Sequence, residues 1–266
     1  MQVIGTKLQR SNWPLALVVA VPALAVFETR GLFDSYRDVL RWMLERGVPS
    51  ALFRLDGYLL LLLGALLGAR LAAGRGEVLR SLGAENACGK GLMLGSIIGL
   101  PSLLLAPFVS DGPVWPGAGA VPMLVAPVAF EAFFRGLLVS IPCRLGGRRF
   151  WGTAALAGLA FGTVSISWGY VTGWEWVPDF CVMTVEGVWL AWLLRCYGSN
   201  LWVTIGVSAV MRATWTIFNV SDGVDNAAPW PDVAFGISAV VGTLMAIRHR
   251  RGQSPAPSHD RGDAAL

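Results

Sequence analysis

The amino-acid sequence predicts an all-α fold, a polytopic bundle of about eight transmembrane helices. Hydrophobic residue types make up 55% of the 266 residues, charged types make up only 14%, and the apolar residues are gathered in long runs. A soluble globular domain carries about 25% charged residues. The low charge and the long apolar runs therefore indicate that lipid, rather than water, surrounds most of the chain.

Eight apolar stretches reach or approach the roughly 20 residues that a helix needs to cross a bilayer. They cover residues 13–28, 57–73, 90–109, 119–142, 151–171, 180–197, 200–219 and 232–248. We expect residues 1–84 to form N-terminal transmembrane helices and residues 85–248 to form the core. The polar, proline-containing residues 249–266 are expected to be a disordered tail.

Residues of about 30–47, between the first two stretches, form an amphipathic pattern. Phe33, Tyr36, Leu40 and Met43 recur at three- to four-residue spacing, which is typical of a helix with one apolar face. Two placements remain open. The helix lies flat on the membrane surface, or it is an extramembrane helix packed on the bundle.

Apart from residues 29–56, which carry five Arg together with acidic residues and should face outward, Lys and Arg gather in loops on one side of this eight-span map. They are Lys7, Arg10, Arg70, Arg75, Arg80, Lys90, Arg144, Arg148, Arg149, Arg195, Arg248, Arg250, Arg251 and Arg261. The positive-inside rule places these loops and both termini in the cytoplasm, in the organisation of a bacterial inner (plasma) membrane protein. The lipid bilayer is the expected partner, and basic residues spread over short loops do not predict nucleic-acid binding.

Four charged residues interrupt the apolar stretches: Glu131, Arg135, Glu186 and Arg212. Each costs about 2.5–3.5 kcal/mol at the centre of a membrane helix, so each needs a partner. Glu131 and Arg135 are four residues apart and share a helix face. The four residues indicate either a functional site in the membrane or a charge network that fixes helix packing.

Residues 130–136, Phe-Glu-Ala-Phe-Phe-Arg-Gly, resemble the first motif of the CPBP family. This family contains the CAAX prenyl proteases and the bacteriocin-processing (Abi) intramembrane proteases, and its motif is Glu-Glu-x-x-x-Arg. Glu131 and Arg135 match the second Glu and the Arg. Phe130 stands where the family has its general base, the first Glu.

Two further motifs of the family follow in the same order. In the second, Phe-x-x-x-His, Phe161 matches and Ser165 stands at the His position. Residues 198–208 resemble the phrase that leads into the third motif, His-x-x-x-Asn, in which Ser208 stands at the His position and Arg212 at the Asn position. The resemblance covers about residues 85–220 and implies a CAAX-protease-like core.

The resemblance implies a reaction in which a Glu and His residues activate water, but the residues for it are missing here. Both histidines, His249 and His259, lie in the polar tail. Zinc needs at least three nitrogen, sulfur or carboxylate ligands, so we expect neither zinc nor another cofactor. A nucleophilic Ser165 or Ser208 would need an adjacent base, and a carboxylate beside an arginine is a weak one.

Three functions remain open. The favoured one is a non-catalytic family member that binds a membrane protein or a hydrophobic or lipidated peptide, or acts as a partner or immunity-type protein. The second is an active CAAX-type endopeptidase with a divergent site. The third is a small transporter or transporter subunit, which an internal repeat would favour. For Arg212 the preferred partner is Glu131, with Glu186 as the alternative.

Overall fold

The computed structural model describes residues 13–29, 34–49, 52, 55–108, 112–113, 117, 120–145, 148–165, 174, 176–218 and 230–253. Within these ranges the chain forms helices joined by short turns and contains no strand. The main helices are α1 (Trp13–Thr29), α2 (Asp34–Glu45), α3 (Leu55–Ala73), α4 (Val78–Leu82), α5 (Cys88–Leu105), α6 (Ala120–Phe130), α7 (Ile141–Leu145), α8 (Phe150–Ser165), α9 (Trp176–Cys196), α10 (Leu201–Ile217) and α11 (Trp230–Gln253). The prediction of an all-α membrane helix bundle is confirmed.

The eight apolar stretches of the sequence all lie on helices, with shifts at their ends. Helix α9 begins at Trp176, four residues before the expected start. Its first turn contains a proline, which the first turn of a helix tolerates. Asp179 lies in the same turn, where its negative charge is stabilised by the positive end of the helix dipole. Helix α8 ends at Ser165, and the remaining residues of that predicted span, 166–171, lie outside the described residues.

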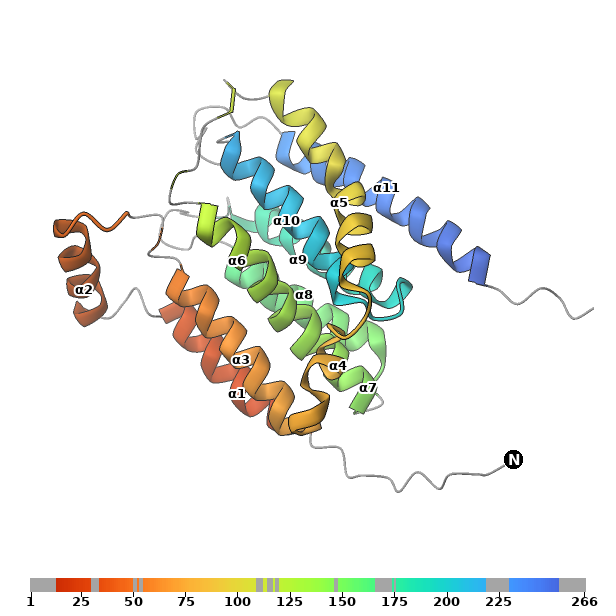
Figure 1. Ribbon diagram of the computed structural model, residues 1–266, viewed down its shortest axis with the longest axis horizontal. Coiled ribbons are helices and arrows are strands. Elements are labelled where there is room, and N and C mark those ends of the chain that lie inside the picture. Colours follow the sequence, from red (N-terminus) through yellow and green to blue (C-terminus); the bar gives the residue numbers. More distant parts are fainter. Residues whose placement is uncertain are drawn as a thin grey trace, which may run out of the picture.

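Among the described helices, four are long and apolar enough to cross a membrane by length and composition. They are Leu55–Ala73, Cys88–Phe108, Ala120–Leu145 and Trp176–Cys196. Ala16–Val26, Phe150–Ser165 and Leu201–Ile217 are apolar but shorter. The helix Ala120–Leu145 differs from the other three because 78% of its most apolar window is buried, against 33% for each of them. It is therefore the central helix, and Figure 1 shows α6 between α3 and α10.

The central helix changes geometry at the motif that carries the charges. Residues Glu131–Ser140 form a π-helical segment between α6 and α7. At its end the N–H of Ile141 donates to the carbonyl of Gly136, five residues earlier. A π-helix is wider than an α-helix and is frequent at functional sites. The motif therefore lies on a local widening of the most buried helix.

Helices α5 and α10 pack with their backbones in close contact. A Cβ atom added at Gly95 would collide with the carbonyl of Val203, and one added at Gly206 would lie 2.7 Å from the carbonyl of Leu92. Small residues permit such close approach in membrane helices, where van der Waals packing replaces the hydrophobic effect as the driving force. The glycines set the position of α10 against the bundle.

Helix α2 confirms the predicted amphipathic helix, with bounds of 34–45 instead of about 30–47. Figure 1 shows it apart from the bundle. Val39, Trp42 and Leu44 are each about half exposed. Its placement on a membrane surface stays a prediction.

Helix α11 extends to Gln253, five residues into the region expected to be disordered. Arg250 and Arg251 lie in its last turn, where the negative end of the helix dipole stabilises positive charges. The ring of His249 packs 4.9 Å from the ring of Tyr197 at the end of α9. These contacts explain why a polar sequence continues the helix; the residues after 253 lie outside the described part of the chain.

Candidate functional site

The centre of the site is a hydrogen bond between the central helix and α10. The Ser208 hydroxyl donates to Oε1 of Glu131 at 2.7 Å. Glu131 is 1% exposed and Ser208 is 5% exposed. A bond of this length from a hydroxyl to a carboxylate is a strong, charge-assisted one. The first and third motifs, 77 residues apart, therefore meet at one carboxylate.

The second oxygen of Glu131 faces Arg135. Its Oε2 lies 3.4 Å from Nε of Arg135, and both side chains are 1% exposed. In the described structure none of the three guanidinium nitrogens of Arg135 has a hydrogen-bond partner, so the contact is an ion pair without hydrogen-bond geometry. The predicted pairing of these two residues on one helix face is present.

Aromatic rings add to the stabilisation of Arg135. Its guanidinium carbon lies 4.3 Å from the ring centroid of Phe161, on α8. Phe134 packs edge-on against Phe161, with centroids 5.4 Å apart. The face of an aromatic ring attracts a cation by about 0.5–2 kcal/mol, more when the cation is desolvated. Phe161 therefore connects the second motif to the buried ion pair.

Among the described residues, Arg212 does not contact either expected acid directly. No ion pair joins Arg212 to Glu131 or Glu186 among the described residues, because Arg135 and Ser208 already occupy Glu131. The Arg212 guanidinium carbon instead lies 4.4 Å from the ring centroid of Phe130. Arg212 is only partly buried, so its charge keeps some solvation. Phe130, at the position of the family's first Glu, provides an aromatic face where the sequence suggested a carboxylate.

Glu186 and Ser165 lie at the edge of this arrangement. Glu186, on α9, is 6% exposed and interacts electrostatically with Arg135 and Arg212 without a direct ion pair in the described structure. Ser165 is the last residue of α8, is partly buried, and has no hydrogen bond to the other motif residues described here. The structure thus joins Phe130, Glu131, Arg135, Phe161, Ser208 and Arg212, and leaves Ser165 outside.

Sequence reasoning named Phe130 and Phe161 but missed Phe134 and Tyr58, the other aromatic residues around the charges. Phe130 stacks on Phe134 with centroids 5.7 Å apart and meets Phe161 edge-on at 6.0 Å. Tyr58 of α3 packs against the other side of Phe130, with centroids 5.7 Å apart. The sequence did contain a signal for Phe134. Phe130 and Phe134 are four residues apart, like Glu131 and Arg135, so the two rings lie on one helix face next to the charged pair.

The residues at the motif positions do not fit a zinc ion. Serines stand at both positions where the family motifs have His. Glu131 is the one carboxylate among the seven motif positions. Among the described residues, no group of three or more His, Cys, Asp and Glu side chains could hold a metal. The chemistry available at this site is that of a hydrogen-bonded, ion-paired carboxylate enclosed by phenylalanines.

Comparison with protein families gives one match. Residues 113–214 match the family model described as type II CAAX prenyl endopeptidase Rce1-like. This range contains all the motif residues and Glu186. No curated protein and no solved structure matched the chain.

Proposed function

We propose that this chain, whose residues 113–214 match the Rce1-like CAAX prenyl endopeptidase family, is a non-catalytic protein of that family that binds a hydrophobic partner in the membrane. The partner class is a membrane protein or a hydrophobic or lipidated peptide, which the chain would hold or present without cleaving it. The basic loops favour a plasma-membrane location with both termini in the cytoplasm.

One observation carries the proposal: the Glu131 carboxylate is buried, with a hydroxyl hydrogen-bonded to one oxygen and a guanidinium beside the other. Ser208 binds one oxygen and Arg135 lies beside the other, while Glu131 is 1% exposed. A general base must reach the proton of a water or substrate, directly or through one water. A carboxylate buried in this way has no solvent-exposed oxygen with which to reach a water or a substrate.

The neighbouring substitutions support the same conclusion. Phe130 places a 5%-exposed ring beside Glu131, where the family has a second carboxylate. Arg212 adds a positive charge over that ring. Apolar bulk beside the carboxylate excludes the water that hydrolysis consumes.

A second candidate rests on the Ser208–Glu131 hydrogen bond itself. A serine 2.7 Å from a carboxylate has the distance of a nucleophile and its base. Attack on a peptide carbonyl would require the Ser208 oxygen to bond the carbonyl carbon while Glu131 takes the Ser208 proton and passes it to the leaving amine. Because Glu131 is 1% and Ser208 5% exposed, a substrate carbonyl has no open approach to this pair, and we rank the peptidase below the binding protein.

Peptide cleavage and metal content separate the two candidates. Purified full-length protein is incubated in detergent with prenylated CAAX peptides, and products are followed by mass spectrometry beside an active endopeptidase of the same class. We expect no product and far less than one zinc per chain. Cleavage that disappears in Ser208→Ala but persists in Thr204→Ser would establish the serine peptidase. Thr204 is a matched control because it is buried one turn earlier on α10 and donates to the Leu201 carbonyl.

Partner binding needs its own test. A photoactivatable prenylated peptide is crosslinked to the purified wild-type protein and digested, and the crosslinked segments are identified. We expect crosslinks in the matched range 113–214 that an excess of unlabelled peptide suppresses. Crosslinking that unlabelled peptide does not suppress would show non-specific partitioning and would contradict a lipidated-peptide partner.

A further inference from the structure

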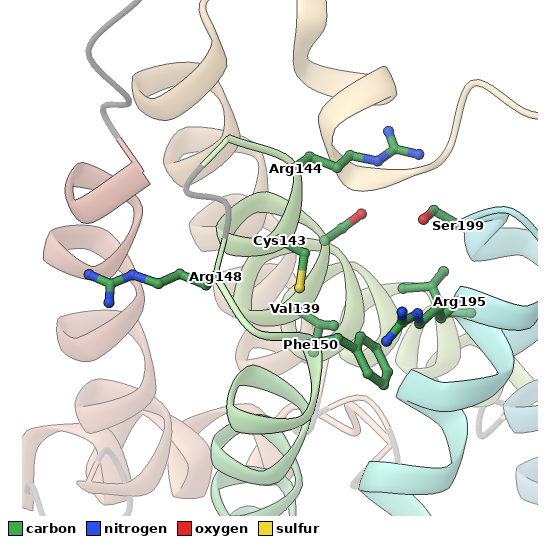
Figure 2. Close-up of a pocket in the computed structure, with 9 residues that line it drawn as sticks. Val139, Cys143, Arg144, Arg148, Phe150, Arg195 and Ser199 are labelled. Atoms are coloured by element: carbon green, nitrogen blue, oxygen red, sulfur yellow. The ribbon is translucent and has the colours of Figure 1, made fainter. Parts of the chain in front are cut away.

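A cavity of about 350 Å³ lies away from the motif residues, between α7, the start of α8 and the turn from α9 to α10. Its walls include Ser140, Cys143, Arg144, Phe150, Arg195 and Ser199. Figure 2 shows Arg144 and Arg195 on the same side of Cys143 as Ser199, with Arg195 beside Phe150. None of the motif residues lines this cavity, so it is separate from the candidate site.

The cavity has a positive wall in which Arg144 and Arg195 form no direct ion pair among the described residues, although Glu85 lies near enough to Arg144 to interact with it electrostatically. The Arg195 guanidinium lies 4.7 Å from the Phe150 ring, and that of Arg144 donates to the Arg80 carbonyl. The two acids of the adjoining loop are directed elsewhere: Glu85 lies 2.9 Å and Glu77 3.3 Å from the Arg80 guanidinium. These two carboxylates, Glu77 foremost, raise the pKa of Arg80. Among the described residues, no carboxylate forms an ion pair with Arg144 or Arg195.

A buried hydroxyl in the same wall has no partner. Ser140 is 3% exposed, lines the cavity, and its Oγ makes no hydrogen bond in the described structure. A buried polar group without a partner costs about 1–3 kcal/mol, so a bound acceptor would remove this cost. The hydroxyl is independent of the arginines and selects a ligand that accepts hydrogen bonds.

An apolar cavity of about 630 Å³ adjoins the positive one. Leu17, Leu138, Pro142, Leu156 and Ala157 form its apolar walls, so it lies between α1, α7 and α8, and Arg149 and Thr153 line it as well. Arg148 lines both cavities. In Figure 2 its guanidinium points away from Arg195 and Ser199, which places its charge at the boundary between the two. A positive cavity beside an apolar one matches an amphiphile with an anionic head.

We propose that the positive cavity binds the phosphate group of an anionic phospholipid and that the apolar cavity holds one of its acyl chains. Guanidinium groups form paired hydrogen bonds with phosphate oxygens, and the Ser140 hydroxyl donates a further one. The cavity lies at helix ends rich in arginine, the level at which lipid phosphates meet a membrane protein. The site is independent of any activity at Glu131.

Lipid titrations of the full chain in detergent, followed by native mass spectrometry, test the proposal. Dioleoylphosphatidylglycerol should bind at one saturable site at least about tenfold more tightly than dioleoylglycerol, which has the same chains and no phosphate. Arg144→Gln with Arg195→Gln should weaken it by about tenfold, and Ser140→Ala by a few-fold. The control Arg70→Gln with Arg75→Gln removes two exposed arginines outside both cavities and should change binding by less than about twofold.

Three results would overturn the proposal. Unchanged lipid binding in the variant Arg144→Gln with Arg195→Gln would exclude the cavity as the binding site. An equal loss of binding in the control Arg70→Gln with Arg75→Gln would show only general attraction of the lipid to a basic surface. Displacement of the lipid by an equal concentration of inorganic phosphate would show a site for soluble phosphate. If the double variant does not fold, Arg195→Gln alone decides the question. Its side chain is exposed and contacts only the Phe150 ring among the described interactions.

Discussion

Removal of either charge of the Glu131–Arg135 pair should strongly destabilise the protein. At 3.4 Å and an effective dielectric constant of about 20, the attraction between the two charges is about 5 kcal/mol, which sets an upper limit. Loss of one member of a buried pair typically costs about 3–5 kcal/mol, because the other charge stays buried alone. Denatured helices in detergent keep some partners, so we expect the lower end, about 3 kcal/mol, for Arg135→Met or Glu131→Gln.

Combining the two changes should recover much of that loss. The amide introduced by Glu131→Gln can still accept the Ser208 hydrogen bond, and the double variant buries no lone charge at this position. The measurement is equilibrium unfolding in mixed detergent micelles, and we expect a coupling of about 2 kcal/mol. Two losses that add within about 0.5 kcal/mol would refute the ion pair. As a control, the cycle of Arg212→Met with Glu131→Gln should be additive, because Arg212 contacts Phe130 and not Glu131.

Three further predictions concern other parts of the molecule. Arg212→Met alone should cost only about 1–2 kcal/mol in the same unfolding assay, because it removes one contact of a partly exposed cation with a ring. Gly95→Ala should cost about 1–3 kcal/mol, because its Cβ would collide with α10, whereas Gly152→Ala, with nothing within 4 Å, should be neutral or stabilising. Reporter fusions after residues 114 and 225 should read as periplasmic in a bacterial host, and a cytoplasmic signal from either would contradict the eight-span topology.

The sequence alone determined the class of protein, the positions of the helices and the pairing of Glu131 with Arg135. These features depend on local information. Apolar runs identify helices that lie in lipid, and a four-residue spacing places two side chains on one face of a helix. The order of three short motifs was also sufficient to indicate the family, which the match over residues 113–214 confirmed.

Only the tertiary structure decided which residues meet across helices. Helical periodicity does not define how a membrane helix is rotated in the bundle, since lipid and neighbouring helices are both apolar. Glu131 contacts Ser208, and Arg212 contacts Phe130. Both contacts depend on the position of α10, which is set by the close packing of its glycine against α5, and on the π-helical geometry of residues 131–140. For the same reason Arg144 and Arg195, distant in sequence, were read only as signals of orientation. Folding brings them to one cavity, because the turns that carry them lie at the same end of the bundle.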